Sequence, residues 1–384
     1  MKPSVLLEIF LRFLGLGCIC FGGPAAHIGY FRNYFVEKHR WLDEQHYTGL
    51  VALSQFLPGP GSSQVGFAIG MNRAGIPGGV AAFLGFTLPS FLLLYLIATS
   101  TAQFADNNIM QGVIHGLKLL AVVVVADATY GMFSNFCKQR WSLCVAIATA
   151  MSLLIFPGIG TQLIVLLSAA AIGSLLGKTN TQASLTLKKP GLISGGLFAA
   201  LALLPLLLID QPLIALFHDF FAAGSLVFGG GHVVLPLLQD LVGDSMSTDR
   251  FLLGYAAAQA VPGPMFTLAS FLGAELYADM PLIGALLATL AVFLPGFLLL
   301  IAFHDSWQSL SNRPRIAAGI QGINAAVVGL LLAALYQPVF SSAINNGTDF
   351  ALVLAGLLLL RGMKLSIILL VIFYIATGAF LLRI

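Results

Sequence analysis

Long apolar stretches separated by short polar ones follow one another along nearly the whole chain. At about 20 residues per crossing, they predict membrane helices near 4–21, 77–100, 111–134, 141–156, 160–177, 191–209, 213–231, 281–303, 315–336, 349–360 and 364–382. Two further apolar stretches, 46–72 and 251–275, are interrupted by Pro58-Gly59-Pro60 and Pro262-Gly263-Pro264. None of the stretches alternates with the two-residue period of a membrane strand, so we expect an all-α polytopic membrane protein.

The composition agrees with this pattern. Hydrophobic residues make up 58% of the chain and charged residues 9%, whereas about a quarter of the residues in soluble domains are charged. The net charge of +3 is small and no basic tract is present, so we expect lipid rather than nucleic acid as the surroundings. Of the four cysteines, Cys18 and Cys20 lie two residues apart in the first apolar stretch and suit small buried thiols rather than a disulfide or metal site. No metal-ligand spacing, nucleotide loop or nucleophile elbow occurs, and neither a metal, a cofactor nor an enzymatic reaction is expected.

Three motifs occur twice in the same order. Phe21-Gly22-Gly23 returns as Phe228-Gly229-Gly230, the first Pro-Gly-Pro returns as the second, and Leu88-Pro89 returns as Leu294-Pro295. The nearly constant offset predicts a duplication, with a first repeat at 1–177, a linker and extra helix at 178–212, and a second repeat at 213–384. Matching interrupted segments in two halves are the best sequence pointer to a transport site.

Lys and Arg in short loops predict the orientation. The basic loop 135–141 corresponds to 337–349, which has neither residue, and the loop 101–110 corresponds to the one holding Arg313 and Arg315. We therefore expect inverted repeats, a cytoplasmic N-terminus and a periplasmic C-terminus. Counting each Pro-Gly-Pro segment as one broken crossing gives 13 crossings. If these segments are re-entrant hairpins, the count falls to 11 and the inversion argument weakens.

A Pro-Gly-Pro break leaves backbone amides free at the start of the following half-helix, where the helix dipole adds positive charge. Hydroxyl side chains follow both breaks, and a glutamine precedes each by three residues. We therefore expect an oxyanion between the two breaks. The expected site consists of Gln55, Pro58, Gly59, Pro60, Ser62, Ser63, Gln259, Pro262, Gly263, Pro264 and Thr267. A plain kink that aids packing is the alternative, and the Phe-Gly-Gly motifs could equally serve packing or line the substrate.

Few ionisable residues fall within the apolar stretches, where such residues are functional by default. Lys118 and Arg12 could attract a dianion, and Asn324 is the repeat counterpart of Lys118. Asp127 could carry a coupling proton. His27 and His232 follow the Phe-Gly-Gly motifs and could titrate near neutral pH. Structural ion pairs and satisfied interfacial histidines are the alternatives.

Together, the duplicated Phe-Gly-Gly and Pro-Gly-Pro motifs around a linker resemble the chromate ion transporter family in its long, two-domain form. The resemblance covers essentially the whole chain, with one departure where Gly231 replaces a proline like Pro24. It implies export of chromate across the bacterial inner membrane, driven by the membrane gradient, and chromate resistance. It also implies a relation to sulfate, which has nearly the same shape and charge.

Other assignments remain open on the sequence alone. A coupling proton or counter-anion and a homodimer are compatible with it. A cation or weak-acid transporter would use Asp127 as its leading residue. A membrane enzyme acting on lipid-linked phosphate would need a nucleophile or base clustered with several Arg or His residues, and the sequence shows no such cluster.

Overall fold

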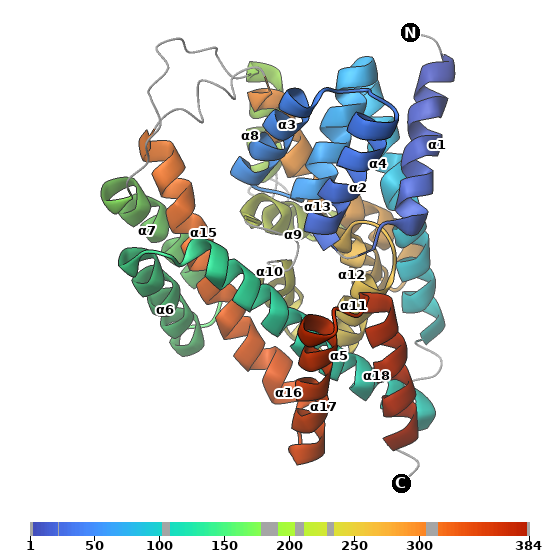
Figure 1. Cartoon of the computed structure of the whole chain (residues 1–384), viewed down its shortest axis with the longest axis vertical. Coiled ribbons are helices and arrows are strands. Elements are labelled where there is room, and N and C mark those ends of the chain that lie inside the picture. The colour runs from blue at the N-terminus through green and yellow to red at the C-terminus, as the bar shows by residue number, and fades with distance from the viewer. Residues whose placement is uncertain are drawn as a thin grey trace.

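The computed structural model describes residues 3–21, 23–101, 108–177, 191–203, 211–228, 234–304 and 314–381, and these residues form helices and connecting loops without strands (Figure 1). The first half contains α1 (Pro3–Ile19), α2 (Gly23–Phe31), the π-helix η1 (Arg32–Lys38), α3 (Glu44–Phe56), α4 (Gly61–Thr101), α5 (Asn108–Phe136), α6 (Arg140–Ile155) and α7 (Ile159–Leu176). Then follow α8 (Leu192–Leu203), α9 (Pro212–Leu226), α10 (Val234–Val242), η5 (Gly243–Ser245), α11 (Thr248–Ala260), η6 (Met265–Thr267), α12 (Leu268–Leu276), α13 (Pro281–Phe303), α15 (Pro314–Ala334), η7 (Leu335–Phe340), α16 (Ser341–Ala343), α17 (Gly347–Leu357), η8 (Leu358–Gly362) and α18 (Ile367–Leu381).

The predicted all-α membrane architecture is confirmed. Four helical segments among the described residues are long and apolar enough to cross a membrane, namely Gly61–Ser100, Gln111–Phe136, Pro281–Phe303 and Ala317–Ala343, and several shorter apolar helices accompany them. The protein is therefore a multi-pass membrane protein. Its first and last helices lie at opposite ends of the long axis, with α1 near one end and α18 near the other (Figure 1).

The Pro-Gly-Pro segments are tips of helical hairpins, which agrees with the hairpin alternative and not with broken crossings. In the first repeat, α3 leads to the tip and residues 61–73 return from it, because His46 and Asn72 at the open end lie 3.0 Å apart. In the second repeat, α11 and α12 form the matching hairpin, and Arg250 pairs with Glu275 at its open end. Each hairpin thus begins and ends at the same end of its helix pair.

The long helix α4 contains a second reversal. Ala74 and Gly75 have non-helical dihedrals, and Gly75 has a φ of +61° that glycine adopts without strain. Gly70 packs against the backbone of Gly78, a contact that a straight helix would exclude for residues eight apart. Residues 61–73 therefore belong to the hairpin, and residues 76–101 form a separate helix. Gly273 and Gly284 repeat this close contact between α12 and α13.

The expected crossings near 4–21 and 213–231 correspond to α1 and α9, and each of these helices is followed by a reversal of the chain. The chain turns back after α1, because Phe13 stacks on Phe35 of η1 at 4.7 Å between ring centroids and Arg12 lies 2.9 Å from His39. In the second repeat, α9 packs against α10 in the same way. Phe21 lies between α1 and α2, and Phe228 follows α9.

The two repeats exchange helices with each other. Helix α5 packs along α18 and α15 packs along α7, so that each repeat covers its long helix with the last helix of the other. Gly116 lies against the backbone of Tyr374, and Gly322 lies against Ala169 in the equivalent position. Such self-complementary contacts are the property of a two-fold arrangement, here within one chain.

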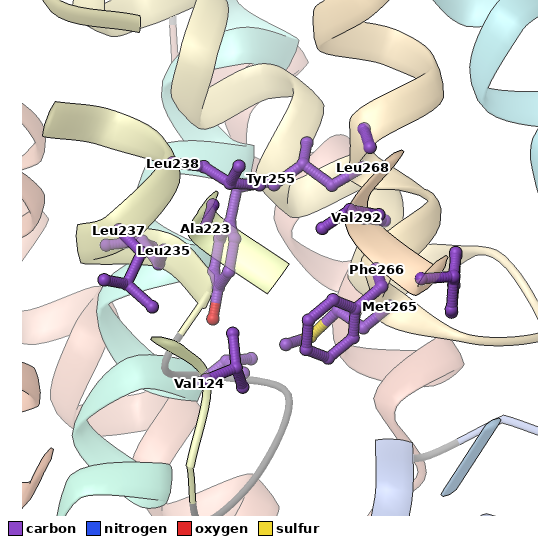
Figure 2. Packing of buried hydrophobic residues seen from close by; sticks show 14 of the residues in the cluster. Val124, Ala223, Leu235, Leu237, Leu238, Tyr255, Met265, Phe266, Leu268 and Val292 are labelled. Carbon is purple, nitrogen blue, oxygen red and sulfur yellow. The ribbon is translucent and has the colours of Figure 1, made fainter. Parts of the chain in front are cut away.

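Buried side chains from both repeats fill the centre. Figure 2 shows Tyr255 of α11 beside Ala223 of α9 and Leu235, Leu237 and Leu238 of α10, with Val124 of α5 and Phe266 of η6 nearby. Tyr255, Phe266 and Val124 are all less than 4% exposed. This packing fixes the second-repeat hairpins against α5.

Candidate anion site

The first Pro-Gly-Pro tip is held by hydrogen bonds that need its particular residues. Gly59 has a φ of +121°, which favours glycine, and its amide donates to the carbonyl of Val227 at 2.8 Å. The buried Gln64 amide nitrogen donates to the carbonyl oxygens of Pro58 and Gly296, both at 3.0 Å. Gln64 therefore pairs the Pro58 carbonyl within the turn and fastens the first tip to α13 through the Gly296 carbonyl.

A cavity of about 740 Å³ lies beside this tip, and we call it the tip cavity. Its walls come from the two N-terminal hairpins, from the C-terminal half of α5, from α15 and from η8. It is lined by Pro24, Ile28, Ala52, Ser54, Gln55, Phe56, Leu57, Gly59, Gly61, Ser62, Asp127, Ala128, Gly131, Met132, Asn135, Phe136, Ala317, Ile320, Asn324 and Arg361.

The start of the returning helix contributes donors to this cavity. Gly61 and Ser62 lie in its wall and belong to the first turn of α4, whose amides have no partner within the helix. The side chain of Ser62 lies 3.3 Å from Nδ1 of the buried His27. On the facing helix, Asn324 is 8% exposed and its Oδ1 has no hydrogen-bond partner among the described residues. The donors on this wall are thus the first-turn amides of α4, whereas the unpartnered atom of Asn324 is a buried acceptor oxygen.

An ion pair supplies the charge of the tip cavity. Arg361 of η8 donates to a carboxylate oxygen of Asp127 on α5, and its guanidinium lies 4.0 Å from the ring centroid of Tyr130. The side chains of Arg361 and Asp127 are 43% and 36% exposed, so both can be reached from the cavity. A planar guanidinium with several donors is the group best suited to an oxyanion. Asp127 already occupies part of this donor set.

The structure brings together some of the residues that the sequence predicted. Gln55, Gly59, Ser62, Asp127 and Asn324 line the tip cavity. Pro58 and Pro60 flank Gly59 in the tip, and Ser63 is buried behind it with its hydroxyl unpartnered. His27 is buried against Phe86, with 5.2 Å between ring centroids.

Other predicted residues lie elsewhere. Lys118 pairs with Asp249 at 2.7 Å in a different cavity. Arg12 pairs with Glu8 at 2.9 Å and its guanidinium lies 5.7 Å from the ring centroid of Trp41. Arg12 also contacts His39, where burial and then the charge of Arg12 lower the pKa of His39. The structure therefore places both predicted cations away from the tip cavity.

The second Pro-Gly-Pro tip is closed by packing. Gly263 has a φ of +102° and its amide donates to the carbonyl of Cys20 at 2.9 Å. Gln259 contacts the sulfur of Met265, and the Thr267 hydroxyl donates to the Pro264 carbonyl at 2.6 Å. None of these residues lines the tip cavity as the structure describes it, and Pro262 is half-buried in the same turn. An anion held equally by both tips does not fit this arrangement.

The Phe-Gly-Gly positions are described in part. Phe21 and Phe228 are half-buried, and Gly23 has a φ of +76° at the start of α2. Gly22, Gly229, Gly230 and His232 lie outside the described residues.

Arg361 is the residue that the sequence reasoning missed. It falls between two predicted crossings, and Lys364 beside it makes the segment read as an ordinary basic loop. Asp127 was singled out, and an unpaired carboxylate deep in an apolar helix predicts a cationic partner. A search for that partner among basic loop residues could have raised Arg361 as a candidate.

Comparison with known proteins agrees with this membrane architecture. The family model described as Chromate transporter matches twice, at residues 7–174 and 214–380. The chromate transport protein of Pseudomonas aeruginosa is 29% identical over 340 residues, covering 86% of this chain and 80% of that protein. The chromate transport protein of Cupriavidus metallidurans is 27% identical over 380 residues, covering 94% and 89% respectively.

A shorter relative matches only part of the chain. The uncharacterized transporter YwrA of Bacillus subtilis is 22% identical over 150 residues, which is 39% of this chain but 84% of that protein. No solved structure matches the chain. The two family matches together span most of the sequence, and on that basis the chain belongs to the chromate transporter family.

Proposed function

We propose that the protein is a secondary active transporter that exports chromate, or a similar tetrahedral oxyanion, across the bacterial inner membrane and so confers chromate resistance. The observation that carries the proposal is Arg361 at the wall of a cavity that also holds the start of α4. The chromate transport proteins among the relatives point to transport rather than catalysis. No lipid-phosphate chemistry is needed to explain this cavity.

We extend the proposal to the membrane topology. If the four hairpins stay on the side from which they enter, nine helices remain as crossings, four in each repeat and α8 between them. An even number per repeat plus one extra crossing inverts the second repeat relative to the first. The basic residues near 138, 188, 313 and 361 then all fall on the cytoplasmic side, as the positive-inside tendency requires. The N-terminus is cytoplasmic and the C-terminus periplasmic in this arrangement.

The same topology supports the domain division. The repeats at 1–177 and 213–384 correspond to the two matches of the family model, and the exchanged packing of α5 with α18 and α15 with α7 relates them. The segment 178–212 carries the linker and the extra helix.

Charge provides the driving force for export. A membrane potential acts on a dianion with about 4.6 kcal/mol per 100 mV, twice the value for one elementary charge. Because the cytoplasm is negative, this energy favours exit. The residues around the tip cavity only need to lower the cost of moving the dianion out of water, which is prohibitive for an unpaired charge.

Asp127 supplies a means of coupling. The Asp127 carboxylate and an oxyanion compete for the guanidinium of Arg361, so binding of the anion there requires that the Arg361–Asp127 ion pair break. Protonation of Asp127 removes the charge that competes with the oxyanion. Asp127 is therefore a candidate to carry the coupling proton. His27, which contacts Ser62, is a second candidate for that role.

Flux measurements in proteoliposomes test the function. Purified protein is reconstituted, a potential of defined sign is imposed, and uptake of chromate, sulfate, molybdate and a monovalent weak acid is compared. We expect saturable, potential-dependent flux of at least one tetrahedral dianion, reduced on the order of tenfold by Arg361→Gln. Arg140→Gln, an exposed arginine outside the cavity, serves as the control. Flux of the weak acid alone, or of cations, would overturn the proposal.

A further inference from the structure

A second polar cavity, of about 720 Å³, lies around Lys118, and we call it the Lys118 cavity. Its wall includes Gln111, His115 and Lys118 from α5, the start of α11 and the start of α17. His115 Nε2 lies 2.8 Å from Asp349 Oδ1, and Lys118 Nζ donates to Asp249 Oδ1 at 2.7 Å. The tip cavity shares none of these residues, so the proposed function leaves this cavity unexplained.

The two cavities occupy related places in the two repeats. Gln111, Ile114 and Lys118 of α5 line the Lys118 cavity. Ala317, Ile320 and Asn324 of α15 line the tip cavity, each 206 residues later. The same face of the equivalent helix therefore forms a wall of each cavity. In an inverted duplication, equivalent places open toward opposite sides of the membrane.

The Lys and Arg content of the loops that border the two cavities also indicates that the cavities open on opposite sides of the membrane. The Lys118 cavity is bordered by Asn345, Asn346 and Thr348, within the loop 337–349 that has no Lys or Arg. The tip cavity is bordered by Asn135 and Phe136, next to Lys138 and Arg140. By the distribution of basic residues, the tip cavity faces the cytoplasm and the Lys118 cavity faces away from it.

The two partners of the Lys118–Asp249 ion pair differ in how far their side chains are buried. The Lys118 side chain is 9% exposed and the Asp249 side chain is 64% exposed. Asp249 also lies in the first turn of α11, where the helix N-terminus stabilises a carboxylate without help from lysine. A buried ammonium without an anionic partner is costly. Asp249 can therefore swing into water, whereas Lys118 needs another anion to replace it.

Arg250, in the wall of the same cavity, is bound by groups that also hold its hairpin together. Arg250 donates to the carbonyl of Ala98 at 2.6 Å and pairs with Glu275, across the open end of its hairpin. Its contacts fasten the hairpin, so Lys118 is the cation in this wall whose partner an incoming anion can displace. The amides of Gln111 and Asn345 add donors around it.

From these relations we infer that the Lys118 cavity is a second oxyanion site, on the face of the membrane opposite the tip cavity, where a tetrahedral dianion replaces Asp249 as the partner of Lys118. The inference rests on the proposed function, because the Lys118 cavity would be a second binding site that the exported anion occupies before release. The two sites share α5, and Asp127 and Lys118 are nine residues apart along it.

Labelling of single cysteines tests the site and its side together. In a chain with its four cysteines replaced by serine, Gln111→Cys reports on the Lys118 cavity and Asn135→Cys on the tip cavity, since both positions are exposed. A membrane-impermeant maleimide is applied to right-side-out and to inside-out vesicles. Sulfate and molybdate are the protecting ligands, because chromate itself oxidises thiols.

We expect the cysteine at 111 to label in right-side-out vesicles and the one at 135 in inside-out vesicles. Either dianion should slow both reactions. Lys118→Gln should raise the concentration needed to protect position 111 on the order of tenfold, and leave protection at 135 unchanged. Asp249→Asn removes the competing carboxylate and should lower the concentration needed at 111. This second variant keeps the test decisive if Lys118→Gln does not fold.

Two results would overturn the inference: labelling of position 111 from the same side as 135, or protection at 111 that neither Lys118→Gln nor Asp249→Asn alters. Failure of the proposed function has another signature. In that case protection at 135 is absent or does not depend on Arg361, whatever happens at 111.

Discussion

The amide of Gly59 donates to the carbonyl oxygen of Val227 across 2.8 Å. The tip of a hairpin in the first repeat is thereby fastened to a tip in the second. Gly263 and Cys20 make the reciprocal bond at 2.9 Å, in the opposite direction between the repeats. The hairpin tips are thus joined by the backbone itself, and side chains contribute specificity around them.

The hairpin geometry is open to direct test. Because the side chains of His46 and Asn72 contact each other at 3.0 Å, the pair His46→Cys and Asn72→Cys in a cysteine-free chain should be joined by a short bifunctional thiol reagent. A broken crossing would place these residues about 40 Å apart, at 1.5 Å per residue. The pair His46→Cys and Asn345→Cys, on opposite sides in the proposed topology, should not be joined by the same reagent. The measurement is the mobility shift of the full chain after cleavage at a protease site inserted between the two cysteines.

Substitutions at the two central glycines should differ in severity. A Cβ at Gly59 would lie 2.8 Å from the Cα of Gly296, which is backbone, and one at Gly263 would lie 2.8 Å from the Ser90 hydroxyl, which can rotate. Both replacements also force alanine into a φ region that costs about 1–3 kcal/mol. We expect Gly59→Ala to abolish transport and Gly263→Ala to reduce it.

Gly15→Ala is the matched control for these variants. Gly15 lies on α1, outside the lining of both cavities, with no atom within 4 Å of an added Cβ, and alanine is the better helix former by about 1 kcal/mol. Transport by Gly15→Ala should equal that of the parent chain. Equal activity of Gly59→Ala and Gly15→Ala would show that the tip does not need its present backbone.

Gln64→Leu should destabilise the first tip. The substitution keeps the approximate volume but leaves the Pro58 carbonyl unpaired, at about 1–3 kcal/mol for a buried group, and removes the side-chain bond to the Gly296 carbonyl of α13. The thermal midpoint of the purified protein in detergent should fall, and transport should fall with it. Ser134→Ala, an exposed residue whose hydroxyl bonds its own helix, should leave the midpoint unchanged. An unchanged midpoint for Gln64→Leu would mean that water satisfies the Pro58 carbonyl.

Arg361 and Asp127 should give opposite effects on anion affinity. Arg361→Gln removes the cation, and we expect weaker binding on the order of tenfold. Arg361→Lys should recover only part of it, because a point charge replaces a planar fork. Asp127→Asn removes the competing carboxylate and should tighten binding while weakening any coupling to protons. These values come from concentration-dependent flux in proteoliposomes. If Asp127→Asn weakens binding as strongly as Arg361→Gln, the pair is structural.

The sequence was sufficient for the helical class and for the family resemblance, which rests on the repeated motifs. Hydrophobic stretches and repeated Gly and Pro positions depend on local physics, which a single chain displays directly. Gln55, Gly59 and Ser62 were predicted as neighbours because they flank one break, and they do line one cavity.

The errors have a common physical origin. Apolar length does not reveal whether a helix continues or turns back, and the contact of Phe13 with Phe35 decides that for α1. Lys118 and Asp249 are 131 residues apart, and Asp127 and Arg361 are 234 apart. Pairings over such distances follow from the exchange of helices between repeats, which no local pattern reports. The filling of the second tip by Met265 is likewise a matter of packing.

The exchange of helices has a consequence for how the chain holds together. Since α5 is covered by α18 and α15 by α7, neither half buries its own long helix, and the molecule is built like a domain-swapped dimer whose subunits have been fused. The linker between the halves then fixes their one-to-one ratio and raises their local concentration, while the interlocked helices provide cohesion. A chain divided between residues 178 and 190 should therefore assemble from two separately expressed halves. Either half alone should leave its long helix without the helices that cover it in the whole chain.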